Sequence, residues 1–226
     1  MTAAHPAFTV AVWLGNAAPV RSIRWLDGAL GTAARFGTTG VTAVAAGHAT
    51  WLDLAADRAT RLGLASAGVR TDLELDYLGW AQVVTAVAAK LGATIVLVDE
   101  ASRPDRFAEV AAVAELMDAA QLTHAVALTP EPGVIHASRA AGATLQTVRV
   151  HAPAVIGLRI AGPPIDEYPT PTPSAAMRRF ELSDLGLDPA VLGHRALPPR
   201  SGPQTRRAVD RVAELLAVHA APRRDA

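Results

Sequence analysis

Short apolar runs alternate with longer segments of helical period over the first 130 residues of the chain. The runs are rich in β-branched residues and alanine and are bounded by Gly, Pro or Asp, which is typical of strands. They lie at 8–14, 41–45, 69–75, 94–99 and 124–129. Apolar residues spaced by three or four positions predict helices in between, at 28–36, 50–62, 78–91 and 106–119. Asp27 and Thr50 are expected to cap the first two helices.

This alternation predicts an α/β fold with three layers and a doubly wound, mostly parallel sheet. Residues 94–98, Thr-Ile-Val-Leu-Val, are almost continuously apolar, as expected for a central strand that is covered by helices on both faces. The alternation stops after Pro130. A strand that alternates around Leu145, Thr147 and Arg149, a break at Pro153 and an apolar strand at 154–160 predict an antiparallel hairpin added to one edge of the sheet.

The chain is expected to divide near residue 160. Prolines recur at 163, 164, 169, 171 and 173, and such a segment is extended because proline cannot join a helix or a ladder. We therefore expect a nucleotide-binding-like α/β domain at 1–160. Residues 161–226 are expected to form a Pro-rich C-terminal arm, turns and a last amphipathic helix that pack on a partner subunit.

Composition excludes several classes of function. The chain has 21 basic and 21 acidic side chains, so no net field favours nucleic acid or an anionic membrane. It has no cysteine, which excludes disulfides, iron–sulfur clusters and thiolate zinc sites. Residues 1–7 lack the features of a signal peptide, and the apolar runs are strand-sized. We expect a cytoplasmic protein with no nucleic-acid partner and no membrane insertion.

Three collinear segments carry a resemblance to a known family. The segment 137–157 resembles the signature of the electron transfer flavoprotein beta subunit through Arg139, Gln146, Val148, Pro153 and the pair Val155-Ile156. Asp184-Leu-Gly-Leu-Asp188 and Pro198-Pro-Arg-Ser-Gly202 are similar to two later turns of that family. The chain departs from the pattern at 142–144, where the family is acidic, and at Gly157.

The resemblance implies an electron carrier and not an enzyme. Such a beta subunit forms a heterodimer with an alpha subunit that holds most of the FAD, and the flavin shuttles electrons from a dehydrogenase to an acceptor. The family's loop for docking a flavin-dependent dehydrogenase corresponds to the region of Tyr168, Thr172 and Met177. The family also buries AMP. Here residues 108–111, Ala-Glu-Val-Ala, replace its phosphate loop, and Glu109 would repel a phosphate, so we expect the AMP site to be degenerate.

Candidate cofactor contacts follow from the same resemblance and from the rule that ligands bind at the carboxyl ends of parallel strands. They are Leu14, Gly15, Asn16, Trp25, Asp27, Gly47, His48 and Asp99. The resemblance places an aromatic residue near Trp25 close to the flavin, so Trp13 or Trp25 could pack against FAD; the alternative for both is the core or a subunit interface. Capping is the alternative for His48 and Asp99.

No metal site and no catalytic residue are expected. The seven histidines are scattered without metal-ligand spacing, and no nucleophile lies near an evident base. Two other hypotheses remain open. One is an adenine-nucleotide-binding, stress-type regulatory module that forms a homodimer. The other is a structural subunit whose cofactor sites have decayed.

Overall fold

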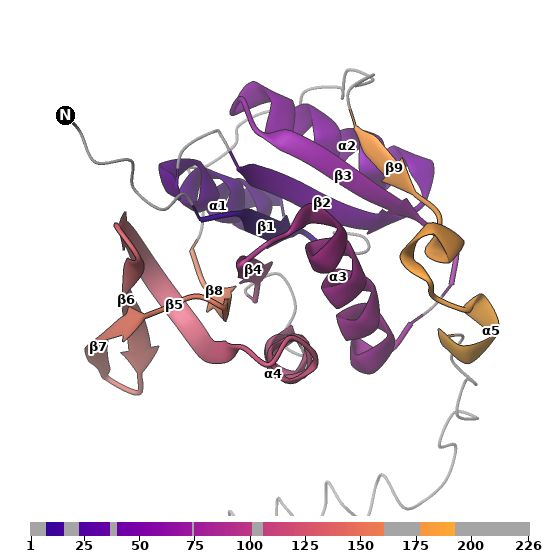
Figure 1. Cartoon of the computed structure of the whole chain (residues 1–226). Helices are drawn as coiled ribbons and strands as arrows, with labels where there is room; N and C mark the ends of the chain where they lie inside the picture. Colours follow the sequence, from indigo (N-terminus) through magenta and orange to yellow (C-terminus); the bar gives the residue numbers. More distant parts are fainter. Residues whose placement is uncertain are drawn as a thin grey trace, which may run out of the picture. The chain divides into compact units, whose positions relative to one another are not determined.

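A computed structural model gives the fold of residues 8–15, 23–36, 40–73, 75–100, 106–160 and 177–192; the side chains at 23–25 and 106–107 lie outside this description. Over these residues the chain forms one sheet in the order β7-β6-β5-β8-β4-β1-β2-β3-β9 (Figure 1). The strands are β1 (Val10–Trp13), β2 (Val41–Gly47), β3 (Ala65–Arg70), β4 (Ile95–Asp99), β5 (Ala120–Glu131), β6 (Val134–Ala141), β7 (Thr144–Val150), β8 (Ala154–Leu158) and β9 (Arg178–Phe180).

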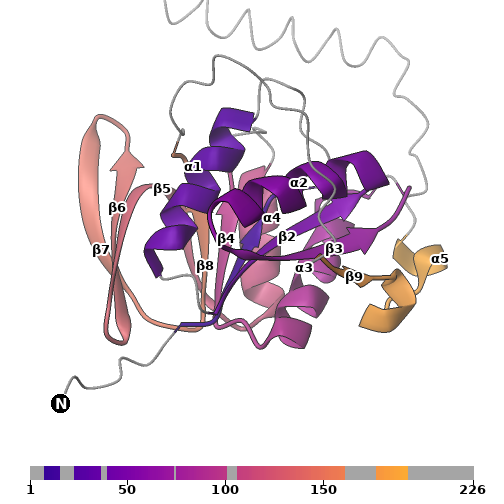
Figure 2. The same cartoon turned by 90° about the horizontal axis from the view of Figure 1, so that it is seen from above.

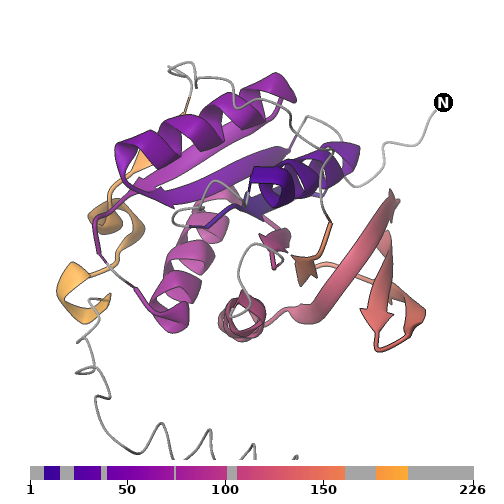
Figure 3. The ribbon, with the colours of Figure 1, turned by 180° about the vertical axis from the view of Figure 1, so that it is seen from behind.

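The helices cover both faces of the parallel part of the sheet. They are α1 (Ile23–Ala33), α2 (Ala49–Arg61), α3 (Tyr77–Leu91), α4 (Arg106–Leu116) and α5 (Pro189–Leu192), with the 3-10 helices η2 (Ala34–Phe36) and η3 (Leu182–Leu185). Figure 3 shows α1 and α2 on one face and α3 and α4 on the other. Each pair packs on its own apolar cluster, so the sheet is buried between two helical layers.

The predicted fold class is confirmed. β8, β4, β1, β2 and β3 are all parallel neighbours, and β5 also runs parallel to β8. The residues of β1, β4 and β8 are buried throughout, because both faces of each strand are covered. An antiparallel ladder of β5, β6 and β7 extends the sheet at one end, and β9 lies at the other (Figure 2).

The expected hairpin between the strand around Leu145, Thr147 and Arg149 and the strand at 154–160 is wrong. The partner of β7 is β6, through a turn at Gly142, whose φ of +61° suits glycine. β8 instead returns to the interior of the sheet and pairs in parallel with both β4 and β5. A strand with five consecutive buried residues must be covered on both faces, and a hairpin at the sheet edge would leave one face in water.

Several predicted boundaries also differ. The third strand is Ala65–Arg70 and not 69–75. Its small residues pair with β2 beneath α2, and small residues give only a weak hydrophobic pattern in the sequence. The fifth begins at Ala120. Helix α1 begins at Ile23, so Asp27 lies within it, and the cap of α2 is His48 and not Thr50.

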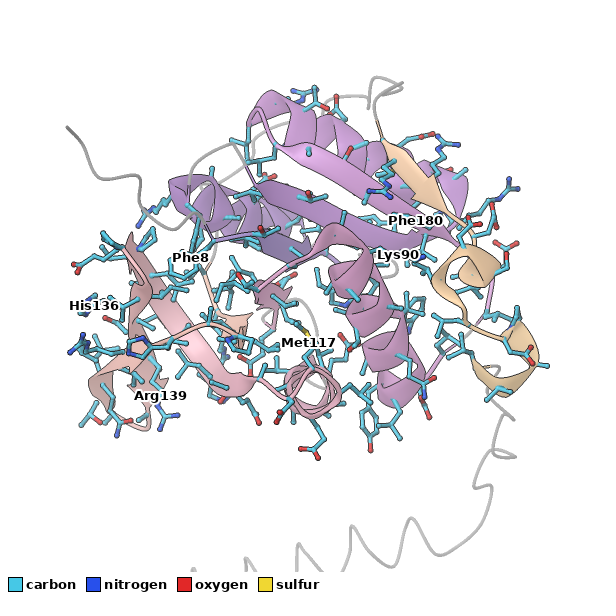
Figure 4. The ribbon with its side chains drawn as sticks, in the orientation of Figure 1. Phe8, Lys90, Met117, His136, Arg139 and Phe180 are labelled. Atoms are coloured by element: carbon cyan, nitrogen blue, oxygen red, sulfur yellow. The ribbon has the colours of Figure 1, made fainter. Side chains whose placement is uncertain are left out.

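The segment 177–192 joins the same sheet. β9 pairs in parallel with β3, and its last residue, Phe180, belongs to the apolar cluster that includes side chains of α3 (Figure 4). Contacts between Cα atoms divide the chain into 1–193 and 194–226, and the second unit, with the expected last helix, lies outside the described residues. The division expected at residue 160 stays a prediction. Within the described ranges no helix is long and apolar enough to span a membrane.

Candidate functional site

The strand order reverses between β1 and β4, and this switch point defines the candidate site. From β1 the chain proceeds through β2 to β3 on one side, while β4 begins the strands on the other side. In open α/β sheets, ligands bind at the carboxyl ends of the strands where this reversal occurs. Leu14 and Gly15 follow β1, while Asp99 ends β4 and Glu100 follows it, so these four residues lie at this end of the sheet.

The backbone after β1 is tied to β2 and α2. The N–H of Leu14 donates to the Val44 carbonyl at 2.8 Å. The Gly15 carbonyl accepts from the Ala46 N–H at 3.2 Å and from the Trp51 indole N–H at 2.9 Å. Leu14 is buried, and Gly15 has a φ of +87° that favours glycine. Leu14 and Gly15 thus form a fixed, mostly internal turn.

His48 and Gly47 stand at the start of α2. The exposed His48 is the N-cap, and its Nδ1 accepts from the Trp51 N–H at 3.3 Å, which satisfies one of the free donors of the helix. In this role Nδ1 is unprotonated and Nε2 remains free for another contact. Gly47 has a φ of +131° and is buried. The capping alternative for His48 is therefore confirmed, and its role toward a cofactor stays a prediction.

Asp27 is engaged between two helices. Its carboxylate lies 3.4 Å from the guanidinium of Arg58 on α2. Burial raises the pKa of the Asp27 carboxyl above its ordinary value, and the positive charges of Arg58 and Arg61 only partly offset this effect. This geometry indicates an internal ion pair that joins α1 to α2.

Trp13 belongs to the core on the other face of the sheet. It is buried, and its ring lies 5.8 Å from that of Trp80 on α3, at an interplanar angle of 41°. Its indole N–H donates to Glu109 at 3.3 Å. The structure thus supports the core alternative for Trp13. The side chain of Trp25, and Asn16 as a whole, lie outside the described residues.

Three buried carboxylates gather around the ends of β4 and α4. Asp99 ends β4, Glu100 follows it, and Glu109 lies in the first turn of α4, where the helix dipole favours a negative charge. The Glu100 carboxylate accepts from the backbone N–H of His124 at 2.7 Å. Sequence reasoning assigned no role to Glu100, because its partners come from β5 and β8, far along the chain. The sequence signal for a close contact was Gly157, at which the chain departs from the family pattern.

Met177 does not occupy a docking surface in this structure. The resemblance led us to expect it there, but its side chain is only 8% exposed and belongs to the apolar cluster under α2. A Cβ added to Gly68 would lie 2.6 Å from the Met177 sulfur, so the missing side chain on β3 makes room for this anchor. Tyr168 and Thr172 lie outside the described residues.

Comparison with known proteins identifies one family. The family model of the electron transfer flavoprotein domain matches residues 25–185, from α1 through η3. A search of the curated proteins returned no match to this chain. The match covers more than half of the 226 residues and includes both ends of the sheet.

Proposed function

Because this chain belongs to the electron transfer flavoprotein domain family, we propose that it is the beta-type subunit of a heterodimeric electron transfer flavoprotein. Members of this family carry electrons and are associated with a flavin. In our proposal an alpha-type partner holds most of the FAD, and the present chain completes the pocket. The family match over 25–185 supports the electron-carrier role, and the resemblance of 137–157 to the beta-subunit signature supports the choice of subunit.

The geometry of the switch point supports a shared pocket. The Gly15 carbonyl accepts a hydrogen bond from the Trp51 indole, the Glu109 carboxylate accepts one from the Trp13 indole, and the Glu100 carboxylate accepts one from the His124 N–H. These groups are therefore already satisfied within the chain. The exposed imidazole of His48, beside the glycine at 47, is the described polar group best placed to meet a cofactor brought by a partner.

FAD would supply the one-electron chemistry of the complex. The part of this chain would be to exclude water with Leu14, to bring the backbone at Gly15 and Gly47 close to the cofactor, and to offer the Nε2 of His48 as a polar contact. Asn16 and Trp25 belong to the same proposed contact surface. A fixed apolar wall and one polar group tune a redox potential through dielectric and hydrogen bonding.

The carboxyl end of β4 bears on the AMP site. Glu100 is buried there, and its carboxylate already accepts from the His124 N–H, a donor that a phosphate would otherwise use. This observation supports a degenerate AMP site. It also disfavours the stress-type nucleotide-binding homodimer, for which tight binding of ATP or AMP by the isolated chain is required.

Co-expression with an alpha-type chain tests the proposal. We expect a one-to-one complex with the visible absorbance of an oxidised flavin, which bleaches on reduction, whereas the isolated chain is colourless. Calorimetry of the isolated chain with ATP and AMP should show no binding. Failure to form the complex, or a folded complex that never holds flavin, would reject the proposed role, and the second result would favour a structural subunit with decayed sites.

Two variants of His48 separate capping from cofactor contact. Asparagine can cap a helix as well as histidine but cannot reproduce the reach of the imidazole, whereas alanine removes both roles. We expect His48→Asn to leave stability unchanged and to lower the flavin content of the complex. Glu115→Ala, at an exposed position of α4, is the matched control.

Dehydrogenase docking at Tyr168 and Thr172 is part of the same proposal. It is tested by the rate of electron transfer from the dehydrogenase after substitution of each residue.

A further inference from the structure

The Glu100 carboxylate sits inside the fold at the carboxyl end of β4. Its side chain is 4% exposed, and its neighbours come from β5 and β8. The backbone N–H of His124 donates to Oε2 at 2.7 Å. The Nδ1 of the same His124 lies 2.6 Å from Oε1, although the angle is not that of a good hydrogen bond. The carboxylate is thus held by one backbone donor, and the imidazole of His124 lies beside it.

Gly157 on β8 makes room for this carboxylate. A Cβ built on Gly157 would lie 2.6 Å from Oε2 of Glu100 and 3.0 Å from a methyl group of Val110. Any side chain at position 157 would therefore collide with the carboxylate. Glycine serves the same purpose in phosphate-binding loops, where the backbone must approach an anion closely.

The backbone of β5 is shaped around the same group. The register of β5 against β8 shifts between Leu122 and Ala125. Within this irregularity His124 has a φ of +62°, which is uncommon for a residue with a side chain. The irregular backbone directs the His124 N–H at the carboxylate and away from the ladder. Backbone N–H groups in left-handed conformation are a common element of anion-binding concavities.

We propose that the Glu100 carboxylate is an internal anion. It fills a space at the carboxyl ends of β4 and β8 whose backbone donor and missing side chain suit an anion, and so the chain retains anion-binding geometry while it excludes phosphate. The donor at His124, the space at Gly157 and the position after β4 carry the inference. It does not depend on a flavin or on a partner subunit, because all three residues belong to this chain.

Removal of the carboxylate tests the proposal on the full chain. In Glu100→Ala the backbone N–H of His124 and the space beside Gly157 become available, and we expect inorganic phosphate to bind at least about tenfold more tightly than to the wild type. Formate and phosphate should also raise the midpoint of thermal unfolding of this variant, relative to chloride at the same ionic strength. The wild type and the control Glu115→Ala should show neither effect.

Glu100→Gln separates charge from space. It removes the charge but keeps the volume, so we expect no gain in phosphate binding. The proposal is overturned if wild type binds phosphate as tightly as Glu100→Ala, or if folded Glu100→Ala neither binds phosphate nor is stabilised by formate. Should Glu100→Ala fail to fold in chloride, refolding in formate decides: recovery supports an internal anion, and equal failure in both salts refutes it.

Discussion

At the scale of single residues, the polar groups at the candidate site are bound mainly to one another. Glu109 is paired with Trp13, Gly15 with Trp51, and Asp27 with Arg58. Buried polar groups need partners, since an unpaired one costs about 1–3 kcal/mol. The residues that the sequence marks as candidate contacts therefore have structural roles first, and any cofactor meets what remains exposed.

Substitution of Gly157 tests whether a side chain can be accommodated at this position. We expect Gly157→Ala to lower the free energy of unfolding by about 1–3 kcal/mol, because the new Cβ collides with Glu100 and Val110. Urea unfolding measures the change. The control is Gly31→Ala in α1, where nothing lies within 4 Å and helix propensity predicts a gain of about 0.5–1 kcal/mol.

Coupling with Glu100 identifies the cause of that loss. In the Glu100→Ala background the collision with the carboxylate disappears, so the cost of Gly157→Ala should fall, leaving only the contact with Val110. An equal cost in both backgrounds would show that the carboxylate is not what excludes a side chain.

The raised pKa of Asp27 predicts a pH-dependent contribution to stability. The folded protein binds the proton more tightly than the unfolded chain, whose ordinary value is 3.8. The contribution is therefore fully present below that value and is lost as the pH rises through the folded pKa. Relative to Asp27→Asn, the wild type should lose stability between about pH 3.5 and about pH 7. Urea unfolding at the two values tests this, and the same difference at both would contradict it.

At the scale of elements, β9 is held by its pairing with β3, by buried apolar side chains and by an ion pair. Met177 fills the notch over Gly68, and Arg179 lies 3.3 Å from Asp53 on α2. Exposed ion pairs contribute little, about 0–1 kcal/mol, whereas a buried methionine contributes more. Met177 therefore contributes more than this ion pair to the attachment of β9.

Met177→Ala should destabilise the protein by about 2–4 kcal/mol and release β9 from β3. Hydrogen exchange of the β9 amides should become faster than that of the central strands. Val191→Ala is the control, because this side chain is 78% exposed. A loss below about 0.5 kcal/mol, typical of surface substitutions, would mean that Met177 is not an anchor.

The elements also show where periodicity has limits. The helical segments 78–91 and 106–119 agree closely with α3 and α4, because their apolar residues repeat over several turns. The sequence predicts the apolar strand at 154–160, which corresponds to β8, but it does not predict the strands with which β8 pairs. Pairing is decided by which buried strands meet in space, and a continuous apolar run carries no information on its partner.

At the scale of the whole molecule, the late segment 177–192 completes the end of the sheet. Phe180, Leu182, Leu185 and Leu192 are buried with the side chains of α3. Their burial joins the C-terminal end of the segment 25–185 to the same core as α3. The family match over 25–185 thus describes one structural unit.

Two truncations test this unit. A chain that ends at Gly193 should unfold at nearly the same urea concentration as the full chain, because the described core lies before that residue. A chain that ends at residue 160 should be less stable by more than about 3 kcal/mol, because each large apolar side chain that is lost contributes about 1.5–3 kcal/mol. Equal stability of both truncations would instead support an autonomous domain at 1–160.

The amino-acid sequence by itself determined the alternation of strands and helices, the parallel sheet and, through short collinear motifs, the family. These properties depend on the local spacing of apolar residues and on residues close together in the chain. Only the tertiary structure decided that β8 lies between β4 and β5, that Met177 is an anchor, and that Glu100 faces His124 and Gly157. The physical reason is that these contacts join distant segments, and a buried group's partner is set by the three-dimensional packing that its own sequence neighbourhood does not encode.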